Sequence, residues 1–212
     1  MPSQRKPLTR AESQQRTREE VLDAAEELFL AHGLHETTVA KIAAAAGRTQ
    51  GAIYGNFTSK ENVCAEVLLR RGLALVSEMW NTIAQSHGTL DDAIDTMVKS
   101  WRIAVQDDDL VALLVEYSLA VHKNPAQLDV SRGHIEMGLS LLGTMLTEAL
   151  PVEVTAAERE EGAKGILSAA LGLALAQTLD VVDMEDASRV LARTIRNWVA
   201  DLSEQSSGRA AS

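Results

Sequence analysis

Residues 37–61 read TTVAKIAAAAGRTQGAIYGNFTSKE, and this stretch decides the fold. Thr38 precedes a short apolar segment, 39–46, and Thr49 precedes a second one over about 50–56. Threonine favours helix starts because its hydroxyl oxygen accepts a hydrogen bond from a backbone N–H of the first turn. The spacing therefore predicts two short helices joined by a tight turn, which is a helix-turn-helix.

The two predicted helices have apolar inner faces and a polar outer face. Gly47 ends the first of them and lies in the turn, and Gly33 follows the long helix before them, where a residue with positive φ is expected. The expected inner residues are Val39, Ile42, Ala43, Ala46, Ile53 and Phe57. The expected outer residues, able to donate hydrogen bonds to phosphates or base edges, are Arg48, Thr49, Gln50 and Tyr54. An ordinary corner of two helices with solvated polar residues fits the same spacing, so both interpretations stay open here.

Helical spacing continues through the rest of the chain, and no segment shows sustained period-two alternation. Capping boxes are expected at Thr58 with Glu61, Thr89 with Asp92, and Thr155 with Glu158. The sequence predicts an all-α protein of about nine helices. The long helices are expected at 13–31, 58–85, 89–106, 107–124, 125–149, 155–179 and 184–202, followed by a frayed tail from Ser203.

Composition limits the class of protein. With 212 residues and 46% apolar side chains, the chain can form one compact domain, or one with a small appendage. One cysteine excludes an internal disulfide framework. The polar N-terminus is unlike a signal peptide, and the longest apolar stretch, 165–179, is too short to span a membrane. We therefore expect a soluble cytoplasmic protein with no membrane partner.

The net charge of −10 is unevenly distributed. Residues 1–60 hold eight basic and seven acidic side chains, whereas the other 152 residues hold 12 basic and 23 acidic ones. The acidity, which normally argues against a nucleic-acid partner, thus belongs to the part beyond the helix-turn-helix. An N-terminal arm with Arg5, Lys6 and Arg10 is interpreted either as a DNA contact or as a solubilising tail.

The stretch 37–61, together with AAEELFLAHG at 24–33, resembles the DNA-binding signature of the TetR (tetracycline-repressor-like) regulators. The resemblance covers about 18–69, a quarter of the chain. It implies that Thr38 caps its helix and touches a phosphate, and that Gly51 brings the recognition helix close to the duplex. It also implies phosphate contacts from Tyr54 and Lys60. The full expected DNA-binding set is Thr38, Arg48, Thr49, Gln50, Gly51, Tyr54 and Lys60.

Two positions depart from the family pattern. Arg48 stands where an aliphatic residue usually packs the turn, so we interpret it as a DNA contact. Gly55 and Asn56 replace a pair that is often aromatic or histidine, which leaves the operator preference open.

The resemblance also implies how the chain is divided. We expect an arm and helix-turn-helix domain at 1–58, an effector-binding and dimerisation domain at 59–204, and a flexible tail at 205–212. The last two long helices would form a homodimer, with small residues on the first and a stripe of Leu191, Ile195, Trp198 and Leu202 on the second. Packing of that stripe inside one protomer is the alternative.

The function that follows is a ligand-responsive repressor that binds a palindromic double-stranded operator as a dimer and is released by a small molecule. The expected effector contacts are Trp80, Met97, Trp101, Glu116, Tyr117 and Met137. Met79, Met145, Arg102, Gln106 and His134 are further candidates. Ordinary core or surface placement is the alternative for each of them.

Catalytic and metal sites are not predicted. The five histidines lack metal-ligand spacing, Cys64 has no partner, and no phosphate loop or nucleophile elbow occurs. We therefore expect no enzyme, no metal and no cofactor, with Cys64 as a small buried residue. A helical small-molecule binding or scavenging protein with a vestigial DNA-binding head is the alternative function.

Overall fold

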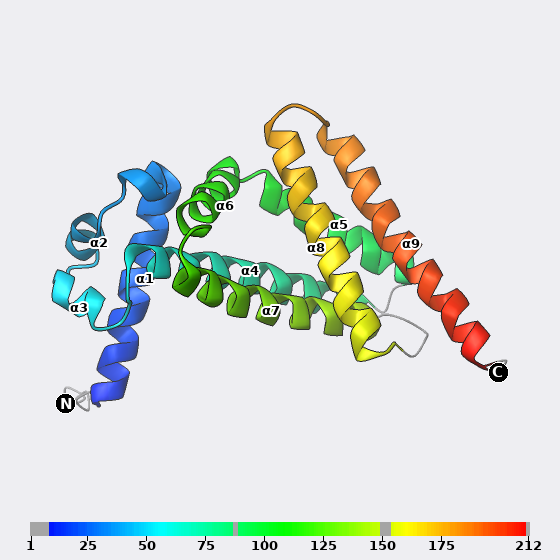
Figure 1. The fold of residues 1–212 in the computed structure, drawn as a ribbon, viewed down its shortest axis with the longest axis horizontal. Helices are drawn as coiled ribbons and strands as arrows, with labels where there is room; N and C mark the ends of the chain where they lie inside the picture. The colour runs from blue at the N-terminus through cyan, green and yellow to red at the C-terminus, as the bar shows by residue number, and fades with distance from the viewer. Residues whose placement is uncertain (1–8, 87–88, 149–153, 211–212) are drawn as a thin grey trace, which may run out of the picture. The chain divides into compact units, whose positions relative to one another are not determined.

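The computed structural model describes residues 9–86, 89–148 and 154–210, which form nine α-helices and no strand (Figure 1). The all-α prediction is confirmed. The helices are α1 (Arg10–Glu36), α2 (Val39–Ala45), α3 (Gln50–Tyr54), α4 (Lys60–Ser86), α5 (Leu90–Val105), α6 (Asp108–Val121), α7 (Pro125–Glu148), α8 (Ala156–Thr178) and α9 (Met184–Ala210). Arg5 and Lys6 of the predicted arm lie outside the described residues.

Most helices begin at the predicted caps. The hydroxyl oxygens of Thr38 and Thr49 each accept a backbone hydrogen bond of 3.2 Å from the residue three positions ahead. Each such cap is worth about 1 kcal/mol because it satisfies an N–H that the helix leaves without a partner. Both predicted capping boxes of the later chain are confirmed, at Thr89 with Asp92 and at Thr155 with Glu158.

The predicted cap of α4 was wrong by one residue. Ser59, not Thr58, caps the helix: its Oγ accepts a hydrogen bond of 3.0 Å from the backbone N–H of Asn62. The Asn62 side chain in turn accepts a hydrogen bond of 3.3 Å from the Thr58 N–H. The Asn62 side chain thus binds the residue before the cap and not the backbone N–H of Ser59, so the two bonds differ from the capping box that was predicted with Glu61.

Two helices are longer than predicted. Helix α1 begins at Arg10 behind a Thr9 cap and resumes after a break at Gly33, whose φ of 73° confirms the expected positive-φ glycine. Helix α9 continues to Ala210, across the segment predicted to be a frayed tail. Leu202 is buried, and no proline follows it to stop the helix.

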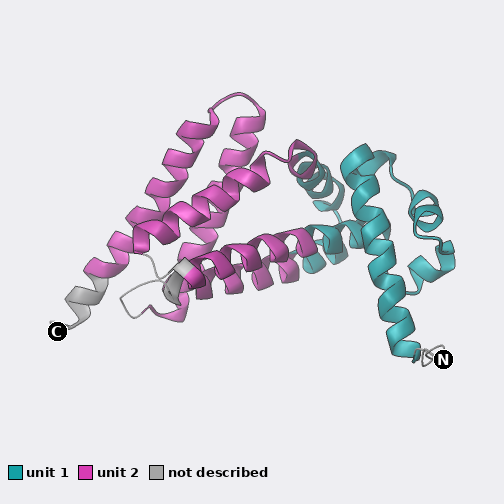
Figure 2. Ribbon diagram, turned by 180° about the vertical axis from the view of Figure 1, so that it is seen from behind, with its two compact units in different colours: residues 1–68, 112–131 teal, residues 69–111, 132–212 magenta. Residues whose placement is uncertain are grey.

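The chain divides into two compact units, coloured separately in Figure 2. Unit 1 comprises residues 1–68 and 112–131, and unit 2 comprises 69–111 and 132–212. This division differs from the boundary expected at 58/59, because unit 1 also takes in the first turns of α4 and α7 and most of α6.

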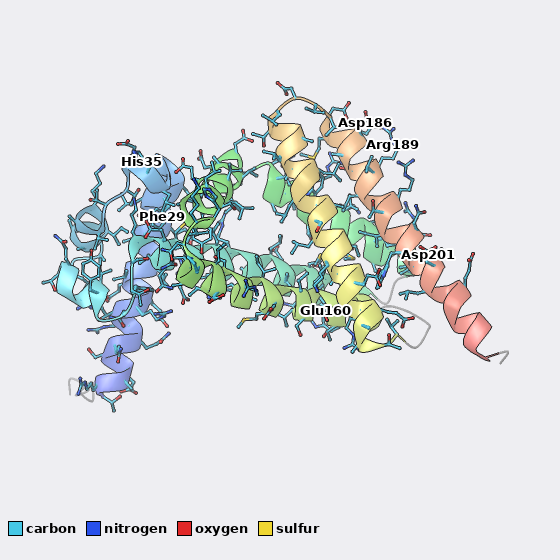
Figure 3. All side chains as sticks on the ribbon, viewed as in Figure 1. Phe29, His35, Glu160, Asp186, Arg189 and Asp201 are labelled. Carbon is cyan, nitrogen blue, oxygen red and sulfur yellow. The ribbon has the colours of Figure 1, made fainter. Side chains whose placement is uncertain are left out.

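The core of unit 1 explains why it extends beyond the three N-terminal helices. Helices α2 and α3 are too short to enclose an apolar core with α1 alone, and α4 and α6 supply the missing side chains. Phe29, labelled in Figure 3, is fully buried in this core. The cluster contains Val21, Ala25 and Phe29 of α1, Ile42 of α2, Ile53 of α3, Val63, Cys64 and Val67 of α4, and Leu113, Tyr117 and Val121 of α6.

Unit 2 has a separate core between α4, α5, α7, α8 and α9. The Trp101 indole N–H on α5 donates a hydrogen bond of 3.1 Å to the Ala170 carbonyl on α8. Leu191, Ile195 and Leu202 are buried within the protomer, with Leu191 and Ile195 in this cluster. The prediction that these three residues of α9 lie at a dimer interface was therefore wrong. The alternative, packing inside one protomer, holds for them.

No helix in the described part of the chain combines the length and the apolar character needed to cross a bilayer.

Gly162 on α8 permits the close packing of α9. A Cβ built at this position would lie 2.0 Å from Cε2 of Trp198. We predict that Gly162→Ala lowers the free energy of unfolding by about 1–3 kcal/mol, because the indole must leave its position. Urea unfolding followed by circular dichroism measures the change.

Gly72→Ala is the matched control, since a Cβ on that residue of α4 meets no atom within 4 Å. It should leave stability unchanged or raise it, because alanine favours helix more than glycine does. Equal stability of the two variants would contradict the packing described for Trp198.

Candidate nucleic-acid interface

Helix α3 is anchored by its apolar side and exposes its polar side. Ile53 on α3 and Phe57 just after it are 1% and 2% exposed. Gln50 and Tyr54 face solvent, and the Tyr54 side chain is 57% exposed. The predicted inner faces are confirmed, since Ile42, Ala43, Ile53 and Phe57 are buried while Val39 and Ala46 pack against them.

The turn between α2 and α3 contains Gly47, as predicted. Gly47 has a φ of 62°, in the region that disfavours residues with a Cβ. The next N–H, of Arg48, returns to the Ala43 carbonyl at 2.9 Å and closes the end of α2. The turn therefore fixes the direction in which α3 leaves α2 (Figure 1).

Gly51 has no role in the packing of the protein. Its φ is not in the left-handed region, and the nearest heavy atom to an added Cβ would be Thr49 Oγ at 3.8 Å. The fold would thus accept alanine here. The glycine leaves the exposed first turn of α3 without a side chain, so that another molecule can approach the backbone closely.

Arg48 is tied to α1. Its Nε donates a hydrogen bond of 2.8 Å to Oε2 of Glu20, and its terminal nitrogen binds the same carboxylate oxygen. The pair links the turn before α3 to α1, and such partly exposed ion pairs contribute about 0–1 kcal/mol. The DNA contact that we expected of Arg48 stays a prediction, and it would require the guanidinium to share or leave Glu20.

Arg18 on α1 is a positioning residue that the sequence reasoning missed. Its guanidinium donates a hydrogen bond of 3.1 Å to the Asn56 carbonyl and forms an ion pair of 2.7 Å with Glu66 of α4. It also lies over the Phe57 ring, 4.5 Å from the centroid. One side chain therefore holds the end of α3 against both α1 and α4. Its partners lie 38 or more positions away in the sequence, so no local spacing indicated them.

Lys60, expected to bind a phosphate, binds the end of α1. Its ammonium donates hydrogen bonds to the carbonyl oxygens of Leu34 at 2.6 Å and His35 at 3.5 Å. A lysine ammonium has three N–H donors, so a phosphate contact would be an additional interaction. That contact stays a prediction, whereas the link between α4 and α1 is observed.

Glu116, expected to orient an effector, also binds this part of α1. Its Oε2 accepts hydrogen bonds from the backbone N–H groups of Leu34 at 2.7 Å and His35 at 3.2 Å. A Cβ at Gly33 would lie 2.7 Å from Oε1 of the same carboxylate. Gly33 is therefore required both by its positive φ and by the approach of Glu116.

The other expected effector residues are not gathered in one place. Tyr117 is buried in unit 1, where its hydroxyl lies 2.6 Å from Ser131 Oγ and burial raises its pKa. Met97 is buried in unit 2, where Trp80 and Trp101 pack against the same cluster. Met137 is 49% exposed.

Cys64 lies in the core of unit 1. Burial, with smaller effects of Glu61 and Glu116, raises the pKa of its thiol to about 12, so the nucleophilic thiolate is scarce near neutral pH. Within residues 9–86, 89–148 and 154–210, no three His, Cys, Asp or Glu side chains are grouped so as to hold a metal ion.

The segment that forms most of unit 1 is similar in sequence to known proteins. Residues 21–67 match the family model described as "Bacterial regulatory proteins, tetR family". The chain is 42% identical over 62 residues to the HTH-type transcriptional repressor BepR of Brucella suis biovar 1, a match that covers 29% of each chain. The chain spans less than half the length of the curated relatives it matches.

Solved structures are similar over most of the chain. A TetR transcriptional regulator from Rhodococcus sp. RHA1 is 20% identical, with a TM-score of 0.69 over 89% of this chain and 98% of that one. SmeT, in a complex with triclosan, is 25% identical, with a TM-score of 0.59 over 85% of this chain and 90% of that one. The fold expected from the resemblance is thus confirmed beyond the DNA-binding segment.

We predict that Arg18→Ala lowers the free energy of unfolding by roughly 1–3 kcal/mol, because a hydrogen bond, an ion pair and a ring contact are lost together. Arg10→Ala removes the same charge from an exposed position on α1 and should change stability by less than about 0.5 kcal/mol. Thermal and urea unfolding of the two variants measure the difference. An Arg18 variant as stable as the Arg10 variant would exclude the positioning role.

Proposed function

We propose, on the premise that this chain belongs to the TetR family of bacterial regulatory proteins, that it binds duplex DNA through α3 and represses transcription as a homodimer. The observation that carries the proposal is the division of α3 into a buried apolar side and an exposed polar side. Such a helix can enter a major groove while its anchors stay in the protein core.

The exposed residues have the chemistry that DNA recognition uses. The Gln50 amide can form paired hydrogen bonds with a base edge, and the Tyr54 hydroxyl can reach a phosphate. Thr38 and Thr49, at the starts of α2 and α3, lie on the surface and are proposed to contact phosphates. Gly51 supports the proposal independently. The fold does not need a glycine at this position, whereas close approach of a duplex to the α3 backbone would need one.

Dimerisation is proposed through α8. Leu171, Leu175 and Leu179 follow each other at four-residue intervals and are 45%, 44% and 64% exposed. A Cβ at Gly165 or Gly172 on the same helix meets no atom within 4 Å, so a partner helix can approach closely there. A two-fold axis would place two α3 helices roughly 34–36 Å apart, as a palindromic operator requires.

Release by a small molecule is proposed for unit 2. SmeT, a structural neighbour, forms a complex with triclosan, which supports an effector site of this general kind. Trp80, Met97 and Trp101 remain the proposed contacts, and binding would require their cluster to repack. An effector releases DNA only if it binds the free conformation more tightly than the DNA-bound one.

Gly51→Ala separates DNA binding from folding. We predict that this variant keeps or slightly raises the stability of the protein, because alanine favours helix. Its affinity for DNA should fall at least about tenfold, or ~1.4 kcal/mol, because the new methyl group meets the duplex. Fluorescence anisotropy measures affinity, with a duplex selected by the unaltered protein from a random-sequence library.

Two results would overturn the proposed function. One is failure of the unaltered, folded protein to select any duplex at low salt. The other is full affinity of Gly51→Ala for the selected duplex.

Leu175→Glu tests the dimer. A charge at the centre of the exposed α8 stripe should convert the dimer to monomers, as measured by sedimentation equilibrium. Leu119→Glu is the control, since Leu119 is 66% exposed on α6, outside the proposed interface, and its change should leave the mass unaltered. A dimer that survives Leu175→Glu would contradict the proposed interface.

A further inference from the structure

A cavity in unit 2 contains a guanidinium group that is not fully satisfied. The cavity has a volume of about 380 Å³ and lies between α7 and the N-terminal part of α8, where Figure 3 labels Glu160. Its wall includes Leu139 of α7 and Arg159 and Lys164 of α8. None of the six residues expected to bind an effector lines it.

Arg159 is held in place by packing. Its Cγ would be 2.7 Å from a Cβ at Gly143, so the glycine on α7 makes room for the arginine stem. The Arg159 Nε is buried and has no hydrogen-bond partner among the described residues. A buried N–H without an acceptor is unfavourable, and the free energy is recovered when a ligand supplies the acceptor.

The other charges of the cavity largely compensate each other. The Lys164 ammonium binds Glu160 at 2.5 Å, and this hydrogen bond together with the nearby Glu136 raises the pKa of Lys164. Two cations and two carboxylates therefore give the wall no formal net charge. A ligand with one negative charge can pair with Arg159, whereas a phosphate dianion would be repelled by Glu136 and Glu160.

We infer that this cavity binds a small monocarboxylate. Because the Arg159 Nε is buried, the guanidinium must turn toward the cavity before Nε and a terminal nitrogen donate hydrogen bonds to the carboxylate. A planar guanidinium matches a carboxylate in this paired geometry. The apolar part of the ligand would lie against Leu139 and Ala156. The volume is within the range of sites for small organic ligands. This inference does not rest on DNA binding, so either one can fail without the other.

Benzoate and hexanoate are the probes, each compared with its neutral amide. Isothermal titration calorimetry at constant ionic strength should show binding of at least one carboxylate, about tenfold or more tighter than its amide. Arg159→Gln should weaken that carboxylate about tenfold while leaving the amide unchanged. Arg193→Gln, the same charge change at an exposed site on α9, should bind like the unaltered protein.

Arg159→Lys keeps the charge but loses the paired donors, so its affinity should fall between those of the unaltered protein and Arg159→Gln. It also preserves the test if the glutamine variant does not fold, which circular dichroism checks beforehand. The inference is overturned if neither carboxylate binds at roughly 10 mM, a concentration that detects even a very weak site. It is also overturned if the amides bind as tightly as the carboxylates. The same holds if every folded Arg159 variant, Arg159→Lys included, binds the carboxylate as tightly as the unaltered protein does.

Discussion

Unit 1 depends on the hydrogen bonds that two charged side chains form with the peptide groups of Leu34 and His35. Glu116 of α6 accepts from their N–H groups, and the Lys60 ammonium of α4 donates to their carbonyl oxygens. These bonds fix the chain where Gly33 breaks α1, immediately before the turn that leads to α2. Charge-assisted hydrogen bonds of this kind are stronger than neutral ones. The start of the helix-turn-helix is therefore set by residues outside the helix-turn-helix itself.

The same arrangement explains how α3, a helix of five residues, is kept in place. An isolated helix of this length is not stable in water, because nucleation costs more than one turn of hydrogen bonds returns. Ile53 and Phe57 fix it to a core completed by α4 and α6, and Arg18 fixes its far end. Helix α4 runs from unit 1 into unit 2, and α6 begins in unit 2 and ends in unit 1. The end of α3 is linked to α4 through Arg18, which binds both the Asn56 carbonyl and Glu66, and α6 binds the end of α1 through Glu116.

The sequence predicted those features that depend on residues close together in the chain. The caps at Thr38, Thr49, Thr89 and Thr155 and the positive φ of Gly33 were readable, because each depends on residues of one local segment. The roles of Arg18, Lys60 and Glu116 were not readable, since their partners lie 25 to 82 positions away. Periodicity identified the apolar stripe of α9, but a stripe alone does not distinguish a neighbour in the same protomer from one in a partner. In the structure, Leu191 and Ile195 pack against neighbours in their own protomer.

We propose that the homodimer presents its two copies of α3 to successive major grooves on one face of a duplex. Hydroxyl-radical footprinting of the full chain on its selected duplex measures this directly. We expect two protected windows of equal size, related by a two-fold axis, with centres about one helical turn apart. A single window, or two windows in direct repeat, would contradict it.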